Sequence, residues 1–152
     1  MAGEFPEIIV RAIGVVRNEV TQPPGASYNW PEVVSELVID RSLTDALDSL
    51  DEFSHIIVLY WIHRVDTAAK LPMKIHPRGN PSLPLTGLLA TRSPHRPNPV
   101  GKATVKLVER RDNILRVKGL DAIDGSPIID IKPYIPEYDS AMDARAPGWT
   151  RQ

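Results

Sequence analysis

The densest group of side chains able to do chemistry lies in the segment Thr91–Gly101, TRSPHRPNPVG. Its three prolines stiffen the backbone in an extended or polyproline-like shape, so the side chains between them lose little entropy on binding. Two arginines there can each grip a carboxylate or phosphate through paired hydrogen bonds. The segment is interpreted as a binding site, and the alternative is a polar crossover between strands. Its polar side chains are Arg92, Ser93, His95, Arg96 and Asn98.

A second candidate is the segment Asp121–Tyr134, which begins with two closely spaced carboxylates. Asp121, Asp124 and Asp130 can form an acidic pocket wall that accepts hydrogen bonds from a ribose, an amine or a reacting N–H group. Asp124 starts an Asp-Gly turn, and the alternation that follows places Asp130 and Lys132 on one face of a short strand. The alternative for each aspartate is turn capping or a salt bridge within the strand. No metal site is expected, because no histidine or glutamate lies at ligand spacing beside these carboxylates.

Two histidines, His55 and His63, bracket an apolar run and are eight residues apart, which places them on one face of a strand. Histidines in such runs are usually core or strand-end groups. Without a Gly-x-Ser-x-Gly motif, a serine hydrolase has no support.

Several classes of protein are excluded by what the sequence lacks. There is no cysteine, so zinc ribbons, iron–sulfur clusters and thiolate nucleophiles are ruled out. Neither Gly-x-Gly nor Gly-x-x-x-x-Gly-Lys occurs, so the Rossmann fingerprint and the phosphate loop are both missing. The net charge is −1, so contact with RNA requires a local basic patch.

Most of the elements that must position these groups are predicted to be strands. One helix is expected at Ser42–Leu50, with Ser42 as its N-cap. The run His55–His63 is interpreted as a central strand buried on both faces, and a hairpin is expected at Arg111–Asn113. The predicted strands are Ile8–Val16, Val33–Ile39, His55–His63, Val100–Arg110, Ile114–Leu120 and Ile128–Ile131.

These elements favour an all-β fold, an antiparallel β-barrel with one short helix and a long Pro-rich loop. Seven of the fifteen prolines lie from Pro72 to Pro99, and residues 71–84 are expected to form the loop. At 152 residues we expect one domain, residues 1–140, followed by a tail, residues 141–152. A signal peptide and an apolar run of about 18 residues are both missing, so a cytoplasmic protein without a membrane anchor is expected.

Four motifs together resemble the TsaA-like (TrmO-type) family. They are GVVR at 14–17, FSHI at 53–56, ATRSPHRPNPVG at 90–101 and DGSPIIDIKPY at 124–134. They occur in the family's order and span residues 8 to about 138.

The resemblance implies a homodimeric β-barrel methyltransferase that uses S-adenosylmethionine. Its implied substrate is tRNA, methylated at N6 of threonylcarbamoyl-adenosine next to the anticodon. An alternative is a sensor on the same barrel that binds S-adenosylmethionine or a nucleotide without catalysis, and a cofactor-free RNA-binding barrel ranks last.

Matching the family's motifs residue by residue also implies a set of site residues. Asp121, Asp124 and His63 are the candidate catalytic bases, and the sequence does not choose among them. Candidate substrate-binding residues are Arg96, Asn98, Lys132 and Tyr134. The implied cofactor-binding residues are Pro24, Gly25, Ala26, His63, Arg64, Arg92, Lys102, Lys118, Gly119, Leu120 and Asp121.

Overall fold

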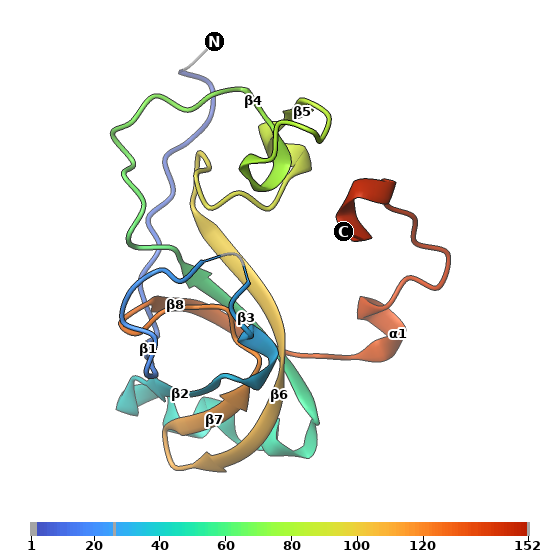
Figure 1. The fold of residues 1–152 in the computed structure, drawn as a ribbon. Helices are drawn as coiled ribbons and strands as arrows, with labels where there is room; N and C mark the ends of the chain where they lie inside the picture. The colour runs from blue at the N-terminus through green and yellow to red at the C-terminus, as the bar shows by residue number, and fades with distance from the viewer. Residues whose placement is uncertain (1–2, 26, 152) are drawn as a thin grey trace.

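The computed structural model describes residues 3–25 and 27–151. Six strands close into an antiparallel barrel in the order β1-β2-β7-β6-β3-β8, as Figure 1 shows. The predicted fold class is confirmed. The barrel strands are β1 (Gly14–Arg17), β2 (Val34–Ile39), β3 (His55–Trp61), β6 (Val100–Arg111), β7 (Ile114–Lys118) and β8 (Pro127–Pro133).

Strand β3 shows how the sequence builds the barrel core. Ile56, Val58 and Tyr60 point inward and are buried, while the residues between them are half-buried on the outer face. The prediction of a strand buried on both faces was wrong, because a barrel interior covers only one face of each strand. Strand β3 pairs with β6 on one side and β8 on the other, so its backbone is fixed along both edges.

The predicted hairpin is confirmed between β6 and β7, where Arg111 pairs with Ile114. Asp112 takes the left-handed conformation at the turn, with a φ of 52°. The buried Asn113 side chain donates to the Ile39 carbonyl at 2.7 Å, which fastens the turn to the end of β2. The hairpin register is therefore set by the turn and by its attachment to the neighbouring strand.

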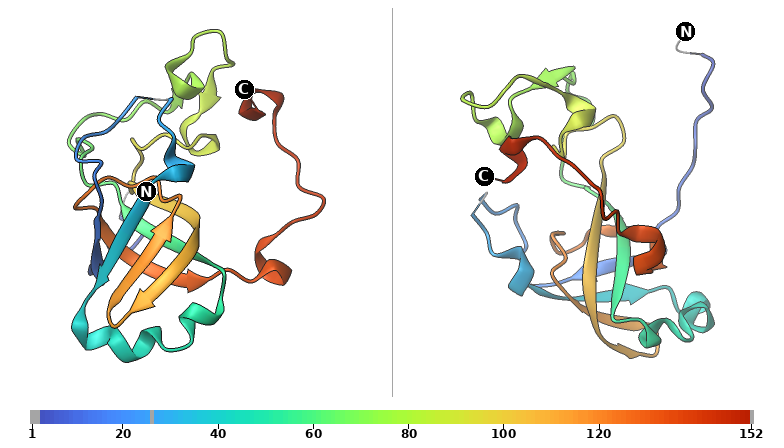
Figure 2. Two further views of the ribbon diagram at one scale, coloured as in Figure 1. Left: turned by 60° about the horizontal axis from the view of Figure 1, so that its bottom comes forward. Right: turned by 90° about the vertical axis from the view of Figure 1, so that its right-hand side faces the viewer.

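The first predicted strand, Ile8–Val16, is mostly wrong, because β1 begins only at Gly14. Strand β8 pairs with Gly14 and Val15 of β1, and the Ile13 amide still donates to the Ile128 carbonyl, so the pairing reaches no further back than Ile13 in the described contacts. Ile8 and Ile9 are 81% and 90% exposed, and the N-terminal segment leaves the barrel as an extended arm (Figure 2).

The predicted α-helix at Ser42–Leu50 is also wrong. The chain forms two 3-10 helices there, η2 (Arg41–Leu47) and η3 (Leu50–Glu52), on either side of the left-handed Ser49. Asp40 is the N-cap, and its Oδ1 accepts hydrogen bonds from the Ser42 amide and hydroxyl at 2.8 and 2.7 Å. Within the described residues the α-helix is α1 (Pro136–Asp139), one turn after the last strand.

The predicted long Pro-rich loop, residues 71–84, is mostly irregular, and together with residues 85–90 it forms a small lobe. Its strands β4 (Lys74–Ile75) and β5 (Thr86–Gly87) make a two-stranded sheet. Leu83 and Leu88 are buried inside it, which gives the lobe its own packing. The remaining 3-10 helices are η1 (Trp30–Glu32), η4 (Pro77–Gly79), η5 (Leu88–Ala90) and η6 (Gly148–Arg151).

The lobe stands beyond one end of the barrel, and the C-terminal turn η6 returns to lie beside it in Figures 1 and 2. In residues 3–25 and 27–151, none of the helices has the length and apolar character needed to cross a membrane.

Candidate functional site

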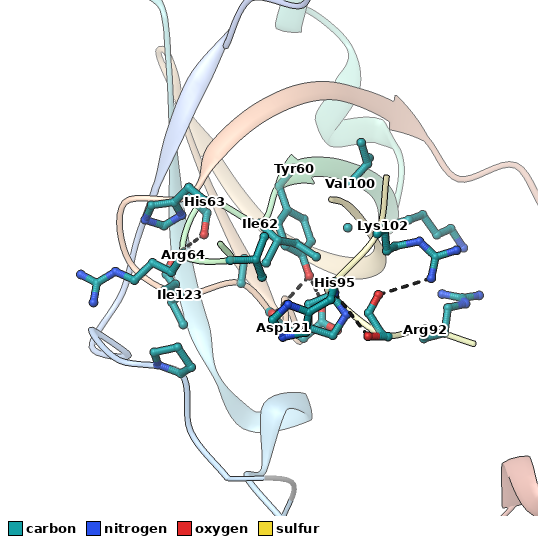
Figure 3. Close-up of a pocket in the computed structure, with 18 of the residues that line it drawn as sticks. Tyr60, Ile62, His63, Arg64, Arg92, His95, Val100, Lys102, Asp121 and Ile123 are labelled. Atoms are coloured by element: carbon teal, nitrogen blue, oxygen red, sulfur yellow. Dashed lines mark hydrogen bonds between the residues drawn. The ribbon is translucent and has the colours of Figure 1, made fainter. Parts of the chain in front are cut away.

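A cavity of about 670 Å³ opens at the end of the barrel where β3 ends and β6 begins. This volume is typical of sites for small molecules and cofactors. Figure 3 shows side chains from β3, β6, the 91–96 segment and the loop after β7 converging on it. The lining residues are Pro23, Pro24, Trp30, Tyr60, Ile62, His63, Arg64, Val65, Arg92, Ser93, Pro94, His95, Arg96, Val100, Gly101, Lys102, Asp121, Ala122, Ile123 and Ser126.

Tyr60 joins the barrel core to the acidic side of the cavity. Its hydroxyl donates to Asp121 Oδ1 at 2.7 Å, the hydrogen bond drawn in Figure 3. Burial, followed by the nearby Asp121 carboxylate and the hydrogen bond to it, raises the pKa of Tyr60 well above its ordinary value. Tyr60 therefore stays protonated and holds an acceptor oxygen at the cavity wall.

Gly101 makes room for the Tyr60 ring. The two residues are paired across β3 and β6, and a Cβ added to Gly101 would overlap the ring and the hydroxyl of Tyr60. The glycine in the NPVG motif thus permits the close approach of a strand backbone to an aromatic ring.

His63 lies just beyond β3, on the cavity wall. Partial burial and then the Arg64 guanidinium lower its pKa from the ordinary 6.5, and Asp124 opposes them. The imidazole is therefore mostly neutral at neutral pH, and a neutral imidazole can accept a proton.

The loop that carries Asp121 is held from behind by Asn18. The Asn18 amide nitrogen Nδ2 donates to the Ser35 hydroxyl at 2.9 Å and to the Ala122 carbonyl at 2.8 Å. The backbone N–H of Asn18 donates to Asp124 Oδ1 at 3.0 Å. The side chain and the backbone N–H of Asn18 thus connect the end of β1, strand β2 and the 121–126 loop.

The segment Arg92–Pro99, which we call the ledge, forms the outer wall. Arg96 Nη1 donates to the carbonyls of Thr91 and Ser93 at 2.7 and 3.3 Å, so this arginine braces the ledge from within. Arg92 is exposed and lines the cavity. Of the two arginines singled out from the sequence, Arg92 is the better placed to meet a ligand.

The cavity combines apolar surface with opposite charges on different sides. Asp121 is the single carboxylate among its lining residues, while Arg64, Arg92 and Lys102 add positive charge. This set suits a ligand that carries an apolar ring, hydroxyl or ammonium donors, and a carboxylate. Residues 3–25 and 27–151 contain no cluster of three His, Asp or Glu side chains able to hold a metal ion.

Besides Ser93 and His95 of the predicted binding segment, seven of the site residues implied by the family's motifs meet around this cavity. Four of them come from the cofactor-binding set alone, Arg96 comes from the substrate set, and His63 and Asp121 are also candidate bases. They are Pro24, His63, Arg64, Arg92, Arg96, Lys102 and Asp121.

The other proposed cofactor-binding residues do not line it. Lys118 forms a 2.9 Å ion pair with Glu32. The Gly119 amide donates to the Val33 carbonyl, and Leu120 is fully buried in the core. Gly25 lies outside the lining, and Ala26 falls outside the described residues.

Four further proposed residues also lie away from the lining. Asp124 lies behind the wall, where it accepts from the Asn18 amide, and Asn98 of the ledge is not among the lining residues. Lys132 pairs with Asp130 at 3.1 Å, as expected for one strand face. Tyr134 packs against His55, at the end of β3 opposite to the cavity.

Sequence reasoning missed several side chains of the wall, above all Tyr60, Trp30 and Ile123. The contact between Tyr60 and Gly101 could not be predicted from the sequence, because it depends on the register of two strands that are distant in the chain.

The protein is therefore a closed six-stranded antiparallel barrel with a charged cavity of about 670 Å³ at one end. Residues 16–140 match the family model described as the tRNA-methyltransferase O N-terminal domain. The chain belongs to this family.

Two sequence relatives illustrate the match. The chain is 45% identical over 136 residues to a "Probable S-adenosyl-L-methionine-binding protein" of Methanothermobacter thermautotrophicus, covering 88% of this chain and 95% of the relative. It is 38% identical over 126 residues to the human "tRNA (adenine(37)-N6)-methyltransferase", covering 83% of this chain and 28% of the relative.

The crystal structure of TrmO from Pseudomonas aeruginosa is similar in fold, with a TM-score of 0.72 and 31% identity. The match covers 92% of this chain and 61% of that one, so the chain spans less than two thirds of the solved protein.

Proposed function

We propose that this protein is an S-adenosylmethionine-dependent methyltransferase that methylates N6 of threonylcarbamoyl-adenosine next to the anticodon of tRNA. The observation that carries the proposal is the cavity lined both by Arg92 and by Asp121, which accepts a hydrogen bond from Tyr60. Membership of the family and the names of the two relatives support S-adenosylmethionine as the cofactor and tRNA as the acceptor.

The lining fits the cofactor's chemistry. S-adenosylmethionine, when bound, supplies a methyl group on a positively charged sulfur. Ile62, Val65 and Ile123 provide apolar surface for its adenine and side-chain carbons. Asp121 would accept hydrogen bonds from ribose hydroxyls or the ammonium group, and Arg92 would hold the carboxylate.

For the acceptor, we favour His63 as the base. It lines the cavity, and its lowered pKa leaves an unprotonated imidazole nitrogen to take the proton that the acceptor N–H loses. Asp121 is less suited, because its carboxylate already accepts from Tyr60, and Asp124 lies behind the wall.

The test is methyl transfer from labelled S-adenosylmethionine to tRNA, followed by mass spectrometry of the nucleosides. We expect one methylated adenosine derivative, and tRNA from a strain lacking the gene should lack it. Arg92→Ala should abolish cofactor binding in calorimetry with the fold intact, and Arg116→Ala, at a different surface, is the matched control. Unchanged affinity in Arg92→Ala would remove that residue from the site.

The second candidate function is a sensor that binds the cofactor without transferring its methyl group. The name of the archaeal relative favours it, because that name mentions binding alone. Binding of S-adenosylmethionine with no methyl transfer to any tRNA would support the sensor over the enzyme.

We also propose that the protein forms a homodimer. Support comes from the N-terminal arm, where Phe5, Ile8 and Ile9 are at least 81% exposed and would be covered by a second copy. Light scattering should give twice the mass of the chain.

A tRNA substrate would place the protein in the cytoplasm. We also propose that residues 1–140 form the catalytic domain and that residues 141–152 are its tail.

A further inference from the structure

A second cavity, of about 710 Å³, adjoins the first. The two cavities share four lining residues of the ledge, Arg92, Ser93, Pro94 and His95. The rest of the second cavity is lined by the lobe and the C-terminal turn. These residues are Ile75, Pro77, Arg78, Gly79, Leu89, Ala90, Thr91, Trp149 and Thr150.

The C-terminal wall comes from a segment that leaves the barrel and returns. After α1 the chain crosses from the barrel to the lobe, and both views in Figure 2 place η6 beside the lobe. Among residues 136–151, Trp149 is the one side chain that is not exposed. Arg78 Nη2 donates to the Thr150 carbonyl at 3.3 Å. Among the described residues, the Trp149 side chain and this hydrogen bond contribute to holding the tail at this cavity.

The charge of the second cavity differs from that of the whole chain. The described lining contains Arg78, Arg92 and His95 and no carboxylate, although the chain as a whole has a net charge of −1. Beside the two arginines, Arg78 and Arg92, lie apolar Leu89 and the indole of Trp149. Cations next to an aromatic face are what single-stranded nucleic acid binds, because its phosphates pair with the cations and its bases stack.

We propose that the second cavity binds a nucleotide of the acceptor RNA at or next to the methylated residue, with Trp149 stacking on its base. Arg78 contacts the anionic group of that nucleotide, which is a backbone phosphate or a carboxylate carried on the base. The inference rests on the proposed function, because it takes the acceptor to be RNA. The sharing of the ledge places this nucleotide directly beside the cofactor cavity.

The test uses the full chain and a fluorescently labelled anticodon stem-loop RNA. Trp149→Ala and Arg78→Gln should each weaken RNA binding by about tenfold in anisotropy titrations, as expected for one lost stacking or phosphate contact. Calorimetric affinity for S-adenosylmethionine should stay unchanged, which also shows that the variants fold. Trp149→Phe keeps a ring and should retain most of the affinity.

Two control variants match these changes. Tyr138→Ala removes an aromatic ring that is 84% exposed in the same C-terminal segment and lines neither cavity. Arg116→Gln removes a cation that lines a separate surface pocket. Both controls should bind the RNA like the wild type.

Two RNAs distinguish the sources of the anion. If Arg78→Gln weakens threonylcarbamoylated and unmodified RNA equally, the contact is to a phosphate; loss confined to the modified RNA indicates the carboxylate. Wild-type affinity in both Trp149→Ala and Arg78→Gln, with methyl transfer to tRNA intact, would overturn this inference alone. A wild-type protein that neither binds nor methylates RNA would overturn the proposed function and this inference with it.

Discussion

The Tyr60 hydroxyl lies 2.7 Å from Oδ1 of Asp121, and this contact joins a buried strand to the one carboxylate among the lining residues of the first cavity. The same hydroxyl also reaches the Asp121 backbone carbonyl at 3.2 Å. Because Tyr60 is only 5% exposed, its position is set by the barrel core. The position of Asp121 therefore depends on the packing of β3.

Replacing Tyr60 with Phe keeps the ring in the core and removes only the hydroxyl. We expect a loss of about 1 kcal/mol in the free energy of unfolding, since Asp121 is solvent-exposed, and a several-fold weaker affinity for S-adenosylmethionine. Urea denaturation and calorimetry measure the two effects. Tyr134→Phe, at the other end of β3, is the control and should change neither; identical behaviour of the two variants would contradict the proposed role of Tyr60.

Gly101→Ala introduces a methyl group where the Tyr60 ring already lies. Forcing the ring or the strand to shift should destabilise the protein by about 1–3 kcal/mol, the usual cost of overpacking. Gly87→Ala is the matched control, because it also lies in a strand and its added Cβ meets no described atom within 4 Å. Equal midpoints of urea denaturation for the two variants would show that the contact is not tight.

The pKa of His63 should lie below the ordinary 6.5 in an NMR titration of its ring protons. Arg64→Gln should raise this pKa by removing a nearby positive charge, and Asp124→Asn should lower it further by removing a negative one. Shifts in the reverse directions would contradict the electrostatic environment described above.

The same shift predicts how His63 contributes to stability. Between the folded-state pKa and 6.5 the unfolded chain binds more protons than the folded one. The contribution of His63 to the free energy of unfolding is therefore complete above about pH 6.5 and is lost as the pH falls through the folded-state pKa. In His63→Asn this part of the acid sensitivity should disappear from the pH dependence of urea denaturation.

Asn18→Asp replaces a donor with an acceptor while keeping the shape of the side chain. The new oxygen would face the Ala122 carbonyl, which now accepts from Asn18 Nδ2 at 2.8 Å. We expect a destabilisation of about 2 kcal/mol and weaker cofactor binding, because the loop carrying Asp121 loses its support.

Asn80→Asp is the control, since Asn80 uses its Oδ1 to accept from Ser82 and an aspartate can do the same. Chemical denaturation should leave this variant close to the wild type. An equal loss in both would mean that added negative charge, not the lost donor, is responsible.

The sequence predicted the barrel because alternation in β2, β6 and β7 is a local property of each strand. The failed helix at Ser42–Leu50 had the right apolar spacing, but the chain leaves the helical conformation at Asp48, and the left-handed Ser49 precedes the second 3-10 helix. The failed first strand was rich in β-branched residues, yet a strand also needs a neighbour, and β8 offers one only from Ile13 onward.

The site was also predicted only in part, because some of its residues are close together in sequence and others meet only through strand pairing. The ledge and the Asp-Gly turn were found because their residues are consecutive in the chain. Lys132 and Tyr134 follow that turn in sequence but run away from the cavity, because β8 is antiparallel to β3 and pairs Ile128 with Tyr60 and Pro133 with Ile56. Tyr60 was missed because its partners are remote in sequence and meet it only through strand pairing.

The closure of the barrel has a consequence for how this family can diversify. Every barrel strand is paired along both sides, so the strands that carry Tyr60 and Lys102 form a scaffold that closes without the lobe or the C-terminal turn. The two outer segments that line the second cavity can therefore change in length and sequence while methyl-donor chemistry is conserved. New acceptors would then arise by remodelling the periphery of an inherited catalytic centre.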